Sequence, residues 1–414
     1  MTSGSIWRSL LGFSIPIMIS NLVQSTYNAV DMLFVGRFTG TESLAAVSVC
    51  GPILNVMIIT LSGMSAGVLV VISGLLGAGD IKQAQDAAHT SVALYALMAA
   101  VMTVLGLLFV PQILRLVQTP AAAMPEAKRY LYTVFAGTVF TFGYNLIGAL
   151  RRGLGNAAAS MSFVIISSAA NIALDAVFIV WLGMGAFGAA LGTVLSQVAA
   201  FVIGTVQFAR GGAALRLSAR AVRFHKKHLK NILLFGVPTA LNEVMVNLAM
   251  LTVSGVANSF GLASSAAYGV GSRINSLAIF TDGAMNQTMS AYASQNIGAG
   301  RQKRALEGLW KAIILSAGAA LGTSLLVLGF ASEFSACFDS DPAVIEQSAA
   351  FLRVTVWSYP LFATVGPLIG FIRGTGNVEA SLLVGVVAQL CCRVPASFLF
   401  SRWMGFPGVG VAVL

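Results

Sequence analysis

Long apolar stretches follow one another along the whole chain, separated by short polar or glycine-containing segments. Each stretch has about 20 residues or more, the length that an α-helix needs to cross the hydrocarbon core of a bilayer. The pattern predicts eleven complete spanning helices and a stub, Gly405–Leu414, that begins a twelfth. The predicted spans cover residues 9–36, 44–76, 88–111, 129–150, 160–182, 187–209, 229–259, 265–296, 308–330, 346–371 and 380–402.

The second half of the chain repeats the first at an offset of about 221 residues. Phe13–Pro16 matches Phe235–Pro238, and Gly155-Asn156 matches Gly376-Asn377. Each repeat has six predicted helices, an even number, so the two repeats have the same orientation. Repeats of this kind are related by an axis along the membrane normal, with the substrate cavity between them.

The fold class that follows is an all-α polytopic membrane protein. It has two six-helix lobes related by pseudo-two-fold symmetry along the membrane normal, and its twelfth helix is truncated in this chain. The expected domains are an N-lobe at 1–209, a cytoplasmic basic linker at 210–228 and a C-lobe at 229–414.

Composition and charge agree with this class. The chain is 57% hydrophobic and 9% charged, whereas soluble domains have about 25% charged residues. Most of the 24 lysines and arginines fall in the N-terminus and every second loop, which the positive-inside rule places in the cytoplasm. We expect a multi-pass protein of the plasma membrane (a bacterial inner membrane) with a cytoplasmic N-terminus. The net charge of +10 is a topology signal, so no nucleic-acid partner is expected.

Signals for enzymatic chemistry are absent from the sequence. There is no G-x-x-x-x-G-K-[ST] segment for ATP, and the four cysteines show no framework or zinc spacing. The three histidines, His89, His225 and His228, are expected in polar loops. We therefore expect no enzyme and no cofactor, apart from a coupling ion.

The first span carries a polar stripe. Asn21, Gln24, Asn28 and Asp31 are spaced three, four and three residues apart, so they share one helical face. An acid within a spanning helix costs about 2.5 to 3.5 kcal/mol on insertion scales, so Asp31 is expected to be functional. Pro16 removes a backbone hydrogen bond earlier in the same helix and makes it easy to bend.

Three polar residues on different spans share one depth. With 1.5 Å of rise per residue, Asp31, Asp175 and Thr193 lie roughly 8–12 Å below the outer ends of their spans. Asn171 lies one turn deeper on the face of Asp175. Two carboxylates in a low-dielectric site can bind a proton, or they can hold a sodium ion together with Asn171 and Thr193. The sequence does not separate the two ions.

Several motifs together resemble the multidrug and toxic compound extrusion (MATE) transporters, in their bacterial DinF-like branch. They are Tyr27-Asn-Ala-Val-Asp31 after Pro16, Asn171-x-x-x-Asp175, Gln295-Asn296-x-Gly298-Ala299-Gly300 and Arg373-Gly-Thr-Gly-Asn377. The resemblance covers essentially the whole chain. It implies export of organic cations and other amphipathic drugs in exchange for protons or sodium ions. It also implies an ion-coupling site in the N-lobe, made of Tyr27, Asp31, Asn171, Asp175, Thr193 and a polar residue of the fourth helix, for which Asn145 is the best match.

Other polar residues and methionines are candidates for the substrate cavity. These are Gln24, Asn28, Glu243, Asn247, Asp282 and Met285. Glu243 and Asp282 could instead pair with Arg273. Met285, like other methionines of the chain, could instead be a packing or lipid-facing residue.

The predicted function is a cation-coupled antiporter (H⁺ or Na⁺) that exports amphipathic, cationic drugs and toxins by alternating access. The alternative is a flippase for a lipid-linked oligosaccharide or another lipid. Such a flippase would need several basic residues in its central spans, where only Arg273 and Arg393 are candidates. The expected partners are small amphipathic molecules and the lipid bilayer, and the protein is expected as a monomer.

Overall fold

The computed structural model describes residues 1–210, 215–278 and 280–412, and these ranges contain helices, turns and loops but no strand. The predicted all-α class is confirmed. Within these ranges, ten helices are long and apolar enough to span a membrane by length and composition. They correspond to ten of the eleven predicted spans. The predicted eighth span, 265–296, instead corresponds to α8 (Leu262–Ala278) and α9 (Phe280–Gly298).

The chain forms two compact units. One contains residues 15–236, and the other contains residues 1–14 together with 237–414. The lobe and linker boundaries expected from the repeat stay a prediction.

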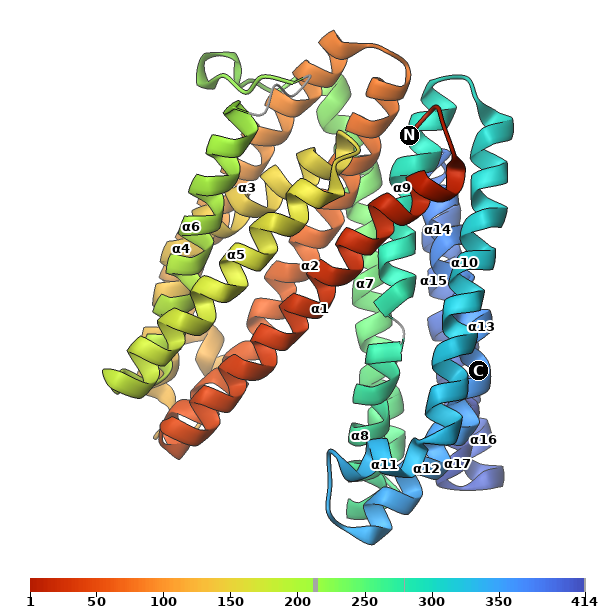
Figure 1. Ribbon diagram of the computed structural model, residues 1–414. Helices are drawn as coiled ribbons and strands as arrows, with labels where there is room; N and C mark the ends of the chain where they lie inside the picture. The colour runs from red at the N-terminus through yellow and green to blue at the C-terminus, as the bar shows by residue number, and fades with distance from the viewer. Residues whose placement is uncertain (211–214, 279, 413–414) are drawn as a thin grey trace. The chain divides into compact units, whose positions relative to one another are not determined.

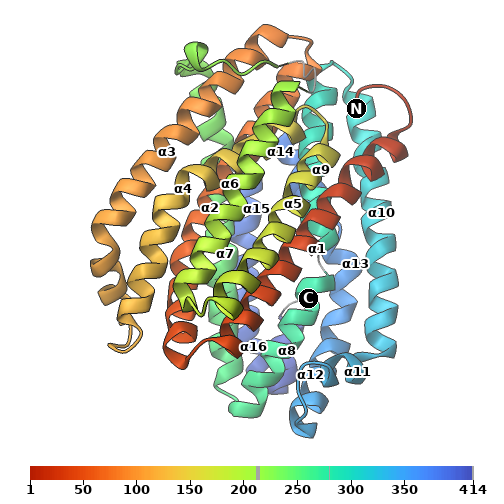
Figure 2. The ribbon, with the colours of Figure 1, turned by 60° about the vertical axis from the view of Figure 1, so that its left-hand side comes forward.

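The unit of residues 15–236 is built around α4 (Met124–Gly153), which packs against α2, α3, α5 and α6. Figure 2 shows α4 between α3 and α6. The core of this unit includes the edge-to-face ring pair Tyr95 and Phe142. The other elements are α1 (Ile6–Phe38), α2 (Thr41–Gly77), α3 (Ile81–Leu116), α5 (Ala157–Asp175), a π-helical segment (Ala176–Trp181), α6 (Gly185–Arg210), a short 3₁₀ turn (Ala219–Ala221) and the start of α7 (Lys226–Asn258).

The second unit is organised around the close pair α9 and α14 (Val365–Gly374), which lie side by side in Figure 1. Gly366, Gly370 and Gly374 form a stripe on α14 at which a Cβ would overlap atoms of α9. Small residues allow such backbone approach between helices in lipid. The remaining elements are α10 (Gln302–Gly329), α11 (Ala331–Ala336), α12 (Pro342–Thr355), a 3₁₀ turn (Val356–Ser358), α13 (Tyr359–Phe362), α15 (Val378–Val386), a π-helical segment (Val387–Arg393), α16 (Val394–Met404) and α17 (Phe406–Val411).

The helices extend beyond the apolar stretches that predict them. For example, α3 begins at Ile81, seven residues before the predicted span, and α7 begins at Lys226. The prediction that all three histidines lie in loops is wrong for His228, which lies in this extension of α7, and for His89, which lies in α3 and already within the predicted span 88–111. Hydropathy marks the hydrocarbon layer, whereas a helix continues until its backbone is capped.

The opening turns of α1 and α7 make equivalent contacts in the two units. Leu10 of α1 is fully buried in a cluster with Met289 of α9. Ile232 of α7 is also fully buried, and a Cβ at Gly67 of α2 would overlap its carbonyl oxygen. Leu10 corresponds to Ile232 in the repeat, and Gly67 corresponds to Met289. The repeat therefore extends from sequence to the packing of each unit.

The Gly-Asn pairs of the repeat form the same helix start twice. Gly155 and Gly376 both have positive φ, +82° and +97°, a conformation that favours glycine. The following Asn156 accepts a hydrogen bond from the amide of Ala159 at 2.9 Å and so caps α5. Asn377 caps α15 in the same way. Both caps satisfy an amide that the helix leaves unpaired.

Candidate functional site

The two acids expected in the coupling site come from α1 and α5. Asp175 is fully buried and is the last residue of α5, directly before the π-helical segment. Asp31 is partly buried on α1. The two carboxyl groups are close enough to influence each other electrostatically. The structure therefore brings together two acids that are 144 positions apart in the chain.

Buried oxygen atoms at these acids have no hydrogen-bond partner among the described residues. They are Asp31 Oδ1 and both carboxyl oxygens of Asp175. The buried side-chain oxygen of Asn171 likewise has no hydrogen-bond partner in the described part of the chain. Burying a polar group without a partner is costly, and carboxylate and amide oxygens are ligands for hard cations. This donor set fits a bound cation, either a proton on a carboxylate or a sodium ion.

Asn171 and Thr193 connect α5 to α6. The Asn171 side-chain amide donates a hydrogen bond of 3.4 Å to the Thr193 hydroxyl. The neighbouring Gly192 lies so close to Asp175 that a Cβ there would overlap the Asp175 carboxyl oxygen. The close approach of α6 therefore brings Gly192, the chain neighbour of Thr193, against the carboxyl group of Asp175.

Two tyrosines lie beside the acids. Tyr27 is one turn before Asp31 on α1 and is within electrostatic range of both carboxyl groups. Tyr130 of α4 is nearly buried and lies within the same range of Asp31, Asp175 and Tyr27. Sequence analysis did not find Tyr130. The predicted fourth span starts at residue 129, which places Tyr130 at its very end, whereas α4 begins at Met124 and Tyr130 lies six residues inside it.

Asn145 does not take part in any of these contacts within the described residues. Its amide donates a 2.8 Å hydrogen bond to the carbonyl oxygen of Thr141 in its own helix. It is fifteen residues beyond Tyr130 on α4, which is roughly 22 Å along the helix axis. Pro16 lies within a continuous α1.

The expected cavity residues in the second half of the chain contact other residues of their own unit. Asp282 Oδ1 accepts a 2.6 Å hydrogen bond from the amide of Gly366, at the start of α14. Glu243 interacts electrostatically with Arg373, and Asn247 donates to the carbonyl of Glu243 in its own helix. Met285 is buried, whereas Gln24 and Asn28 on α1 are exposed.

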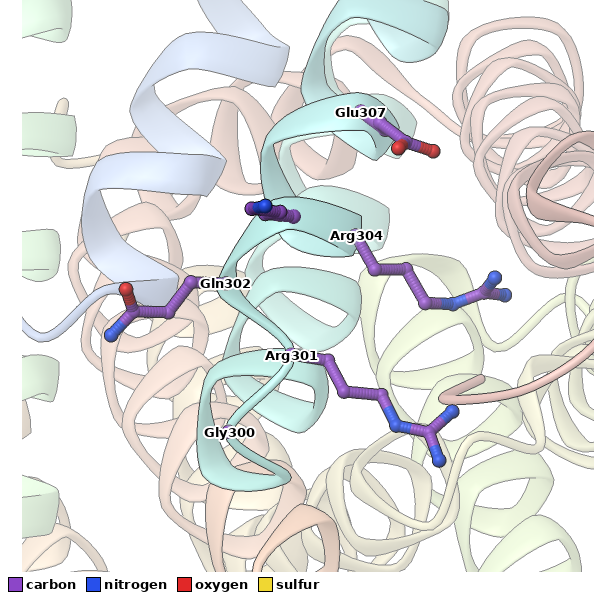
Figure 3. Close-up of a pocket in the computed structure, with 6 residues that line it drawn as sticks. Gly300, Arg301, Gln302, Arg304 and Glu307 are labelled. Carbon is purple, nitrogen blue, oxygen red and sulfur yellow. The ribbon is translucent and has the colours of Figure 1, made fainter.

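An open pocket of about 670 Å³ lies at the start of α10. Figure 3 shows Arg301 and Arg304 extending from the same side of this helix. The Arg301 guanidinium donates to the carbonyl of Thr2 at 2.5 Å, and that of Arg304 donates to Ser3 at 3.1 Å. The two arginines therefore hold the N-terminal segment in the unit of residues 1–14 and 237–414. The paired acids belong to the other unit.

Across residues 1–210, 215–278 and 280–412, no group of three or more His, Cys, Asp or Glu side chains could hold a metal ion. A sodium ion at the paired acids would also need the amide and hydroxyl oxygens of Asn171 and Thr193.

Known proteins similar to this chain share one family. A family model described as MatE matches residues 16–177 and 238–399. The probable multidrug resistance protein YpnP of Bacillus subtilis is 27% identical over 412 residues, covering 100% of this chain and 92% of the relative. The multidrug export protein MepA of Staphylococcus aureus is 22% identical over 407 residues, covering 98% of this chain and 89% of the relative.

A solved structure gives the same result for the fold. It is described as the outward-facing conformation of a multidrug resistance MATE family transporter of the MOP superfamily. It is similar with a TM-score of 0.93 at 25% identity, over 99% of this chain and 92% of that chain. The family match covers both repeats and most of the sequence, and the chain therefore belongs to the MatE family of multidrug and toxic compound extrusion (MATE) transporters.

Proposed function

We propose that this protein exports amphipathic, cationic drugs in exchange for protons or sodium ions, and that Asp31 and Asp175 hold the coupling ion. One observation carries the proposal. The two acids lie within electrostatic range in one unit, and they have buried oxygen atoms without hydrogen-bond partners in the described ranges. A buried pair of this kind attracts a cation, because leaving both carboxylates ionised and unpaired is costly.

Exchange follows if the acids release their ion when the transporter changes state. An ion that binds one state more tightly than the other shifts the equilibrium between states by its difference in binding free energy. A drug that prefers the opposite state then leaves as the ion enters. Asn171, Thr193 and Tyr27 support this site as further oxygen donors around the two acids.

The drug substrates are proposed from the relatives. The printed names of the Bacillus and Staphylococcus proteins describe multidrug resistance and multidrug export. The location proposed is the bacterial plasma membrane, with the N-terminus in the cytoplasm, and the protein is proposed to work as a monomer. The orientation rests on the distribution of lysine and arginine, and the monomer rests on the two-repeat architecture of a single chain.

The decisive experiment compares drug resistance and drug efflux in cells that carry Asp31→Asn or Asp175→Asn. Both variants should lose ion-driven efflux while still reaching the membrane. Glu42→Gln is the matched control, because Glu42 is an exposed acid at the start of α2 in the same unit. Efflux at wild-type rates by Asp31→Asn would overturn the assignment of the coupling site.

The coupling ion is identified in proteoliposomes. Replacing sodium by choline at fixed pH should abolish drug exchange if sodium is the coupling ion, and should leave it unchanged if the proton is. A flippase would instead move a fluorescent lipid across the bilayer and show no drug exchange under either gradient. That result would replace the drug-export proposal with the flippase alternative.

A further inference from the structure

All three histidines of the chain lie at one place, where the segment before α7 passes the first turns of α3. His89 is on α3, His225 directly precedes α7 and His228 is in its first turn. Residues 215–225 connect this place to the end of the first repeat, on the side of the membrane expected to be the cytoplasm. Leu215 is buried in the core of the unit of residues 15–236 and anchors the segment there.

The first contact holds the segment through Gln85 and His89. The Gln85 side-chain oxygen accepts a 2.7 Å hydrogen bond from the amide of Arg216, and its NH₂ group donates to the Arg216 carbonyl. His89 Nε2 lies 3.1 Å from the same NH₂ group and accepts the amide of Ser218 at 3.4 Å. Both neighbours of His89 Nε2 are donors. The contact therefore requires the neutral imidazole with its proton on Nδ1.

The second contact holds the segment through Thr90 and His225. The Arg223 Nε–H group donates a 3.0 Å hydrogen bond to His225 Nε2. His225 Nδ1 lies 3.2 Å from the Thr90 hydroxyl, which also accepts the backbone amide of His225 at 3.3 Å. The bond from Arg223 again requires a neutral ring, because a protonated Nε2 cannot accept it.

Protonation acts on the two contacts differently. A proton on His89 Nε2 would face two donors, Ser218 and Gln85, and would break both hydrogen bonds. A proton on His225 Nε2 would repel Arg223 and favour Asp86 of α3, whose carboxylate lies 3.7 Å away, so His225 stays against α3. Imidazole is the side chain whose charge ordinarily changes between pH 5 and 8.

Further charged residues lie near the three histidines. Asp80, which caps α3, Asp86 of α3 and Lys227 of α7 lie within electrostatic range of His228. The His228 ring is edge-to-face with His225 at 6.0 Å, and its Nδ1 is buried with no partner among the residues described. Lys227 donates to the side chain of Gln83 on α3 at 2.8 Å. This last contact does not depend on a histidine, so it holds α7 against α3 in either protonation state.

We propose that His89 forms an acid-sensitive latch, which docks residues 216–221 on α3 when its ring is neutral and releases them when it is protonated. Leu215 and the contact of Lys227 with Gln83 hold the two ends of the segment in either state. Acid on the side of the linker therefore frees this part of the connection between α6 and α7, at a place separate from Asp31 and Asp175.

A spin label at position 220 tests the latch directly. Arg220 is exposed in the short turn Ala219–Ala221, and it can be changed to cysteine after Cys50, Cys337, Cys391 and Cys392 are replaced by alanine. We expect an immobile label at pH 8 and a severalfold larger mobile fraction at pH 5.5 in lipid nanodiscs. The same measurement on His89→Gln should show an immobile label at both pH values, because glutamine keeps a neutral acceptor.

Two further variants make the outcome unambiguous. His89→Lys places a donor at the latch at every pH and should give a mobile label even at pH 8. His228→Gln is the matched control and should respond to pH as the unchanged protein does. The latch is overturned if the label is equally mobile at pH 8 and pH 5.5, if His89→Gln keeps the pH response, or if His89→Lys stays docked.

Discussion

The backbone of Gly192 on α6 lies directly against the carboxyl group of Asp175 on α5. A Cβ at position 192 would overlap an oxygen atom of that carboxyl group, so a side chain there must displace the acid or push the helices apart. Glycine is the residue that permits such close approach.

Gly192→Ala is therefore expected to impair ion coupling, although it removes no polar group. We expect drug exchange in proteoliposomes to slow roughly tenfold, equivalent to about 1.4 kcal/mol. Gly204→Ala is the control on the same helix, because the nearest atom to its Cβ, on Ile147, would be at 3.4 Å. Equal rates for the two variants would show that the position of Asp175 does not matter for exchange.

The hydrogen bond between Asn171 and Thr193 gives a second prediction. Thr193→Val keeps the shape of the side chain but leaves the Asn171 amide without its partner, at a cost of about 1 to 3 kcal/mol. We expect the affinity for the coupling ion to fall about 5- to 150-fold. Thr193→Ser retains the hydroxyl and should behave like the unchanged protein. Titration of drug exchange against sodium concentration and pH measures the difference.

Asn145, unlike Gly192 and Thr193, is expected to have no effect on ion coupling. The resemblance to the family places it in the coupling network, whereas its amide bonds to Thr141 in its own helix. Asn145→Ala should therefore leave the dependence of exchange on the coupling ion unchanged. A loss of coupling comparable with that of Asp175→Asn would return Asn145 to the network.

The helices and the repeat could be predicted from the sequence because each is recognised from short stretches of residues, without knowledge of how the helices pack. Apolar length predicts α2 at 44–76 and the helix runs from Thr41 to Gly77. At each repeated Gly-Asn pair a helix begins, and two residues explain how: the glycine adopts a positive φ and the asparagine caps the helix. Depth along each helix likewise follows from counting residues, and the prediction that Asp31 and Asp175 lie at one level rests on such a count.

Tyr130 was missed because hydropathy does not mark the end of a helix. Lys128 and Arg129 end the apolar stretch, so Tyr130 appeared at the edge of the fourth span, whereas α4 starts at Met124. The same difference moved His228 from a predicted loop into α7, which starts at Lys226. The contact between Gly192 and Asp175 could not be predicted, because it depends on how closely two helices pack.

The caps of the two repeats allow a paired test of stability. Asn156→Ala and Asn377→Ala each remove a side chain that accepts the first free amide of a helix. Each should cost about 1 kcal/mol, which corresponds to a fall in Tm of roughly 2–4 °C. Thermal unfolding followed by tryptophan fluorescence measures both. Similar shifts would support equivalent roles, and no shift in either variant would contradict the capping assignment.

Pro16 is the last residue for which the structure makes a prediction. It lies within α1 just after the point where the helix passes from one compact unit to the other, between Ser14 and Ile15. Proline has no backbone N–H, so one hydrogen bond of the helix is missing there and bending is easier. If bending at this point accompanies export, Pro16→Ala should slow drug exchange while equilibrium drug binding stays unchanged. Pro111→Ala is the matched control, because Pro111 also lies within a long helix, α3. Export by Pro16→Ala at the rate of the unchanged protein would mean that α1 need not bend at Pro16.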